Sequence, residues 1–206
     1  MVSRLCLFLG FLVLAAAPVT GRAAETDIED IYGDIFEVRP SADHIVICHG
    51  FGCQHRVTVA LEQSDLAALA RLFKASRVSA AAERRSVALA AAWFDRKVGP
   101  AAGTVGRIAY AGPKVANDPR QMDCVDISHN NTSLFMVLED LGLLLHHKVE
   151  HPAGRGALID GVLPHATAVL REVHDNRKWA FDSWTRRYGE LPEVMTLDRW
   201  MTDESR

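Results

Sequence analysis

Two stretches of alternating polar and apolar residues in the C-terminal half constrain the fold of this chain most strongly. They cover residues 165–173 and 178–184, and the polar segment between them, His174 to Lys178, is typical of a turn. A period of two indicates strands with one face buried. We therefore predict a β-hairpin here, with residues 143–149 and 157–163 as further strands.

Helical spacing of apolar residues dominates the middle of the chain. It begins after Ser64 and again after Ser79, both of which are predicted helix caps, and Gly99-Pro100 is predicted to end the second helix. A third helix is predicted from Cys124 to Gly142. Smaller elements complete the prediction: a strand at 45–48, its hairpin partner at 57–61, a long loop at 99–121 and a short helix at 197–201.

Helices that precede most of the strands are typical of an α+β fold, with helices packed on an antiparallel sheet. The chain carries a net charge of −3 and has no stripe of basic residues, so nucleic acid is not predicted as a partner.

Residues 1–23 have the three-part pattern of a secretory signal peptide. Arg4 supplies the positive charge, residues 5–19 are almost wholly apolar, and Gly21 and Ala23 are the small residues of a cleavage site. An uncleaved anchor is the alternative, although the apolar run is short for a membrane span. We expect residues 24–206 to form a single domain that is periplasmic or secreted, with no membrane association after cleavage.

The cysteines indicate which residues can form a disulfide and which one can remain a free thiol. Four are present, and three remain once Cys6 leaves with the signal. An exported protein favours disulfides, and Cys48 and Cys53 flank a flexible glycine-rich segment that can close; the sequence leaves their pairing open. If they pair, Cys124 is left alone, either as a dimer link or as a reactive thiol.

Cys124 lies at the predicted start of a helix, with Asp123 as its N-cap. Unpaired N–H groups and the macrodipole at a helix N-terminus favour a thiolate. A catalytic Cys124 is therefore expected to be partly exposed and to ionise well below pH 8.5, whereas a structural one is expected to be buried and inert. A thiolate nucleophile needs a histidine as its proton partner and a group that orients that histidine. His165 and Asp182, on the two strands of the predicted hairpin, are the candidates.

The register of the hairpin decides whether His165 and Asp182 meet. A turn centred between Val173 and His174 places them directly opposite each other, whereas one centred between Asp175 and Asn176 places Asp182 opposite Val169. Side chains alternate between the faces of a strand, so both registers put His165 and Asp182 on one face. The pair is therefore permitted, and a bulge can close the remaining gap.

Three motifs in this order resemble the bacterial transglutaminase-like cysteine proteinases, within the transglutaminase and papain-like group. They are Asp-Cys-Val-Asp at 123–126, Pro-His-Ala-Thr-Ala-Val-Leu at 164–170 and Ala-Phe-Asp-Ser-Trp at 180–184. The resemblance covers residues 115 to 186, and the segment from Cys48 to Cys53 has no counterpart in it.

The resemblance implies a papain/transglutaminase-like fold and a cysteine protease or amidase that acts on a peptide or protein through a thioester. Cys124 is then the nucleophile, His165 the general base and acid, and Asp182 the group that orients His165. Gln121 is a candidate oxyanion donor, although papain-like enzymes place their glutamine further upstream. The alternative is a non-catalytic exported binding domain of the same fold.

Histidines elsewhere in the chain raise the possibility of a metal site. His44, His49 and His55 bracket Cys48 and Cys53, and a second group contains His146, His147 and His151. The two cysteines lack the tight spacing of a zinc knuckle, and no second pair accompanies them. We therefore predict neither a metal site nor a cofactor.

Overall fold

The computed structural model describes residues 38–156 and 164–202. The predicted signal peptide at 1–23 and the predicted strand at 157–163 lie outside these described residues. Within them, no helix is long and apolar enough to cross a membrane.

The described residues form helices and two antiparallel sheets. The helices are α2 (Gln63–Leu72), α3 (Ala80–Ala102), α4 (Cys124–Asp140) and α5 (Leu197–Thr202), with short 3₁₀ turns at Ser76–Val78 and Pro113–Val115. The strands are β1 (Ile45–His49), β2 (His55–Val59), β3 (His147–Arg155), β4 (His165–Glu172), β5 (Lys178–Asp182) and β6 (Glu193–Thr196). Strands β1 and β2 form a two-stranded sheet, and the larger sheet has the order β3-β4-β5-β6. The prediction of an α+β architecture with antiparallel pairing is confirmed.

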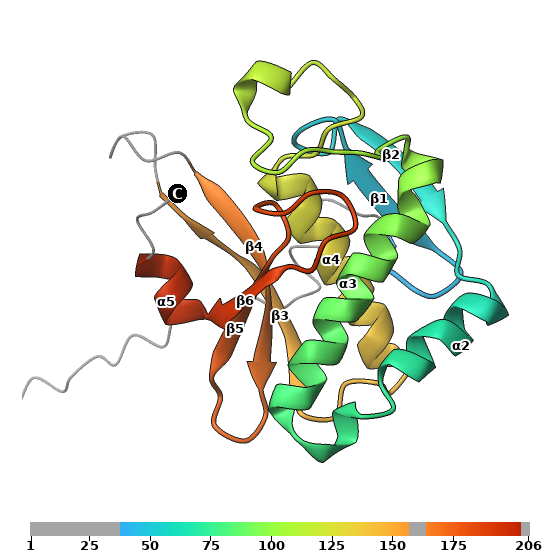
Figure 1. Ribbon diagram of the computed structural model, residues 1–206, viewed down its shortest axis with the longest axis vertical. Coiled ribbons are helices and arrows are strands. Elements are labelled where there is room, and N and C mark those ends of the chain that lie inside the picture. The colour runs from blue at the N-terminus through green and yellow to red at the C-terminus, as the bar shows by residue number, and fades with distance from the viewer. Residues whose placement is uncertain (1–37, 157–163, 203–206) are drawn as a thin grey trace, which may run out of the picture.

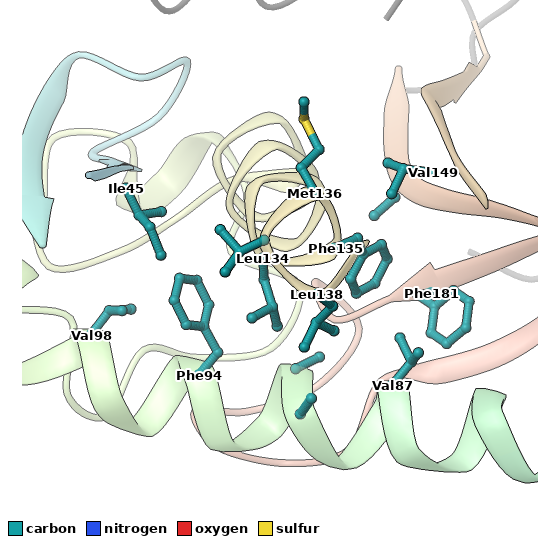
Figure 2. Packing of buried hydrophobic residues seen from close by; sticks show 14 of the residues in the cluster. Ile45, Val87, Phe94, Val98, Leu134, Phe135, Met136, Leu138, Val149 and Phe181 are labelled. Atoms are coloured by element: carbon teal, nitrogen blue, oxygen red, sulfur yellow. The ribbon is translucent and has the colours of Figure 1, made fainter. Parts of the chain in front are cut away.

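Helix α4 lies at the centre of the molecule. It contacts β1 on one side and strands β3 and β4 of the larger sheet on another, while α3 runs across it (Figure 1). Figure 2 views α4 end-on and shows Ile45 of β1, Phe94 of α3 and Phe181 of β5 arranged around it. The helix is buried over most of its length because it has neighbours on several sides.

The core is the apolar surface that surrounds α4. Phe135 meets Phe181 edge-on, with ring centroids 5.2 Å apart, and so joins the helix to the larger sheet. Leu134 and Leu138 are fully buried and lie between α4 and α3 (Figure 2). The packing therefore fixes the position of α4 against the sheet that carries His165 and Asp182.

Two predicted helix boundaries were wrong. The N-cap of α2 is Glu62 rather than Ser64, and it forms a capping box with Asp65. Helix α3 starts after Ser79 as predicted, but it continues through Pro100 to Ala102. Proline leaves the carbonyl four residues earlier without a helical donor, and the hydroxyl of Tyr188 donates to that carbonyl, on Arg96.

The strand predictions were correct in outline and shifted in detail. Strand β3 covers 147–155 instead of 143–149, and its pairing with β4 is interrupted between Glu150 and Ala153. Pro152 lies in this irregular stretch, where a proline is tolerated. Strand β6 was missed, because its four residues are too few to show a period.

Leu138→Ala should lower the free energy of unfolding by about 2–5 kcal/mol, because it leaves a cavity beside fully buried neighbours. Urea denaturation measures the change. Leu145→Ala is the matched control, since Leu145 is 46% exposed and its truncation should cost less than about 0.5 kcal/mol. Equal losses in the two variants would contradict the core described above.

Candidate active site

Cys124 is the first residue of α4, as the sequence predicted. Asp123 is the N-cap, and its Oδ1 accepts a hydrogen bond of 2.8 Å from the N–H of Asp126. Asp126 completes a capping box, since its Oδ2 accepts from the N–H of Asp123 at 3.2 Å. Two carboxylates therefore fix the helical turn that carries the half-buried Cys124 thiol.

His165 and Asp182 form a hydrogen-bonded pair. Nε2 of His165 lies 2.6 Å from Oδ2 of Asp182, and both side chains are buried. The β4–β5 register pairs Ala168 with Phe181, which continues to Asp182 opposite Thr167. This register differs from the two weighed from the sequence, which placed Asp182 opposite His165 or opposite Val169. Asp182 is still on the face of His165, two residues away, and the two side chains meet diagonally across the strands.

Asp182 is held by further donors. The indole N–H of Trp200 donates to Oδ2 at 2.9 Å, and the backbone N–H of Trp184 donates to Oδ1 at 3.2 Å. The rings of Trp184 and Trp200 also lie against the imidazole of His165, with centroids 4.7 and 5.3 Å from it. The His165–Asp182 pair is thus enclosed by two indoles, which fix the ring and limit its contact with water.

The second nitrogen of His165 is available for chemistry. Because Nε2 faces a carboxylate, it carries the proton in the neutral ring, and Nδ1 is left with a lone pair. Nδ1 is buried and has no hydrogen-bond partner within residues 38–156 and 164–202. An imidazole that is oriented through one nitrogen and unpaired at the other has the arrangement of a general base.

Cys124 and His165 line one cavity of about 540 Å³. Sγ of Cys124 lies 3.9 Å from the carbonyl oxygen of Pro164 and also accepts from the N–H of Ala166, the two residues that flank His165. The other lining residues are mostly small or apolar; they are Val125, Gly154, Arg155, Gly156 and Met201. The structure brings Cys124, His165 and Asp182 together from α4, β4 and β5.

The electrostatics of Cys124 oppose the expected thiolate. Burial raises the pKa of the thiol, and the charges of Asp123 and Asp182 raise it further. The backbone N–H groups of Ala166 and of Cys124 itself act in the opposite direction but do not prevail. The direction is opposite to the lowered pKa that is expected of a catalytic Cys124. The helix terminus favours a thiolate, but the carboxylate that caps it does not.

Cys48 and Cys53 form a disulfide. The loop between them contacts the start of α4, because the N–H groups of Phe51 and Cys53 donate to the Asp126 carboxylate at 2.8 and 2.6 Å. Burial and the charge of Asp123 raise the pKa of Asp126 to about 6, although these N–H bonds lower it. The segment without a counterpart in the resemblance thus lies against the turn that holds Cys124.

Gln121, the candidate oxyanion donor, lies outside the lining of this cavity. Its Oε1 accepts from the N–H of Ile108 at 2.9 Å, and its side chain also bonds to Asp118. Gln121 therefore ties the loop at 103–123 together, and its role as an oxyanion donor stays a prediction.

The histidines do not form a metal centre in the described part of the chain, where no three side chains of His, Cys, Asp or Glu are grouped to hold an ion. His49 stacks on His55, with ring centroids 5.3 Å apart, while the sulfurs of Cys48 and Cys53 are bonded to each other. Fully buried His147 instead pairs with the carboxylate of Glu83 at 2.8 Å.

Two residues of the site were missed from the sequence. No local sequence pattern predicts the hydrogen bond from Trp200 to Asp182, because a loop and strand β6 separate Asp182 from α5. Asp126 was noted only as part of a motif, although its position three residues after Asp123 is typical of a capping box.

No family model, no curated protein and no solved structure matches this chain. The assignment of a function therefore depends on the geometry of the site.

Labelling of Cys124 by iodoacetamide should rise with pH and reach half its maximum above about 8.5, the pKa of a free cysteine, because the thiolate is the reacting form. Peptide-resolved mass spectrometry of the protein labelled without reductant measures the profile. The chain unfolded in guanidinium is the reference. A midpoint near pH 6 would contradict a neutral resting thiol.

Trp200→Phe should lower the free energy of unfolding by about 1.5–3 kcal/mol, because a buried carboxylate loses a donor while the ring volume is mostly retained. Urea denaturation at pH 7 measures the loss. Trp93→Phe on α3 is the matched control, since its indole makes no hydrogen bond to the described residues and the variant should be near neutral. A similar cost for both variants would show that the bond to Asp182 is not important.

Proposed function

We propose that this chain is a cysteine hydrolase that cleaves amide bonds of peptides or proteins through a thioester acyl-enzyme. One observation carries the proposal: Asp182 orients His165, Nδ1 of His165 has no hydrogen-bond partner among the described residues, and His165 and Cys124 line the same cavity. A nucleophile, a base and an orienting carboxylate in this arrangement are the parts of a catalytic triad.

The raised pKa of Cys124 determines how the first step proceeds. The thiol is neutral at rest, so Nδ1 of His165 takes its proton as sulfur attacks the carbonyl carbon. The charge that develops on the carbonyl oxygen is stabilised by backbone N–H groups at the start of α4. His165 then gives its proton to the leaving amine, and the thioester remains on Cys124.

Water completes the cycle. Nδ1 of His165, now neutral, accepts a proton from the water that attacks the thioester, and the thiol of Cys124 is restored with release of the acid. Asp182 stays ionised and stabilises the imidazolium in both half-reactions. These reaction steps need no cofactor. Another amine in place of water would make the reaction an acyl transfer.

The lining of the cavity suits an extended peptide with a small or apolar side chain beside the scissile bond. Gly154 and Gly156 leave the backbone accessible, while Val125 and Met201 offer apolar contact. This substrate class is the one implied by the resemblance to the transglutaminase-like cysteine proteinases. The disulfide, together with the signal-like N-terminus, supports a periplasmic or secreted location.

The binding-domain alternative is favoured by one observation, the raised pKa of Cys124. A domain that only binds peptides has no need for an ionisable thiol. The two proposals differ in whether Cys124 becomes acylated.

A panel of fluorogenic peptide amides with apolar residues on the acyl side tests the proposal. His165→Ala and Asp182→Asn should each lower kcat/KM by about 10²-fold or more, because the base or its orientation is lost. Cys124→Ala should abolish hydrolysis and the acyl adduct that mass spectrometry detects after an acid quench.

The matched controls lie on the β4–β5 turn. His174→Ala and Asp175→Asn alter an exposed histidine and an exposed aspartate between the same two strands, and both should leave kcat/KM unchanged. Failure to detect turnover and an adduct with any peptide would favour the binding domain instead.

A further inference from the structure

The disulfide loop has an unusual backbone that the proposed hydrolysis does not use. Four successive residues, Gly50 to Cys53, have positive φ angles of 80°, 68°, 61° and 58°. Phe51 and Cys53 have side chains, for which this region is unfavourable. Such a conformation persists only where surrounding contacts hold it.

The contacts that hold the loop come from the start of α4. Phe51 and Cys53 donate their N–H groups to the two oxygens of Asp126, and Gly52 donates to Oδ2 of Asp123 at 2.9 Å. Successive N–H groups that converge on an anion form a nest. The loop and the first turn of α4 thus share the same two carboxylates.

These carboxylates flank the nucleophile. Asp123 precedes Cys124, and Asp126 is in the same turn and fully buried. If the loop withdrew, Asp126 would keep only the N–H of Asp123 and would remain buried beside a like charge, which is costly. The first turn of α4 would then rearrange, and the sulfur of Cys124 would move relative to His165.

The disulfide fixes one end of the loop to the other. Cys48 is anchored independently, because Asn130 of α4 accepts from its N–H and donates to its carbonyl, both at 2.8 Å. Among the described residues no side chain bonds the backbone carbonyl of Cys53, and the next anchor along the chain is His55 of β2, which pairs with His49 of β1. Breaking the S–S bond would therefore leave Cys53 held only by its N–H bond to Asp126, between the anchors at Cys48 and His55.

We propose that the Cys48–Cys53 disulfide is a redox switch for the Cys124 site, with the oxidised loop holding the first turn of α4 in its reactive position. The proposal rests on the proposed function and adds its regulation. A dithiol supplies two electrons and two protons; the S–S bond breaks, two thiols form, and the dithiol becomes a disulfide. The site is then inactive in a reducing compartment and active where the disulfide forms.

Acylation of Cys124 by p-nitrophenyl acetate tests the switch. The full chain is compared, at one pH, with Cys48→Ser/Cys53→Ser and with Asp126→Asn, and the rate of the matching Cys124→Ala form is subtracted. We expect both variants to lose about tenfold or more of the acylation rate, because the sulfur of Cys124 is displaced from His165. Asp126→Asn keeps the disulfide, so it remains informative if the double variant fails to fold.

The sign of the Asp126→Asn effect separates position from charge. Removal of a negative charge near Cys124 favours the thiolate, so electrostatics alone would speed acylation. Loss of the bonds between the loop N–H groups and the Asp126 carboxylate would slow it. Asp65→Asn is the matched control, because Asp65 is the equivalent residue of the capping box of α2 and should leave the rate unchanged. Hydrogen exchange of residues 124–128 provides an independent readout, and it should accelerate in the disulfide-free and Asp126→Asn forms.

The outcomes separate the two proposals. Equal acylation with and without the disulfide overturns the switch and leaves the hydrolase intact. Slower acylation with unchanged exchange at 124–128 also overturns it, because the turn has not moved. An oxidised chain that acylates no faster than its Cys124→Ala form overturns the hydrolase, and the switch with it.

Discussion

A helix buried on several sides needs partners for most of the polar groups that it carries inward, and α4 is such a helix. Its residues 126 to 133 are polar apart from Ile127, and all are buried. Asn130 bonds to both backbone groups of Cys48, while Asn131 donates to the hydroxyl of Ser183 at 2.9 Å. Adjacent side chains thus tie one helix to the disulfide loop and to the strand end beside Asp182. The position of Cys124 relative to both follows from these bonds.

The same burial creates an electrostatic conflict at the start of α4. Carboxylates are good helix caps, and Asp123 and Asp126 satisfy N–H groups that would otherwise lack partners. Their charges also lie close to the thiol, and that of Asp123 disfavours its ionisation. A neutral thiol resolves the conflict, because no further negative charge then lies beside the two carboxylates. The N–H groups of the disulfide loop offset part of the remaining charge on Asp126.

The sequence predicted what short-range patterns determine. The N-cap at Asp123, the β4–β5 hairpin and the shared face of His165 and Asp182 all follow from local spacing, and the structure has them. Long-range compensation was not predictable: α3 passes Pro100 because Tyr188, far along the chain, satisfies the Arg96 carbonyl. The pKa of Cys124 was misjudged for a similar reason, since burial depends on the whole fold. The predicted roles in catalysis remain predictions, because geometry alone does not test them.

The hairpin that carries His165 and Asp182 has a consequence for the order in which the site assembles. The two residues are 17 apart in sequence, and a hairpin of this size closes in microseconds. Cys124 is 41 residues from His165, so it arrives only after α4 has docked on the sheet, at the greater entropic cost of a longer loop. The imidazole–carboxylate pair is therefore expected to precede the thiol during folding. A partly folded chain then contains the imidazole–carboxylate pair without the thiol, so the activity proposed for the site would appear only once its own core is complete.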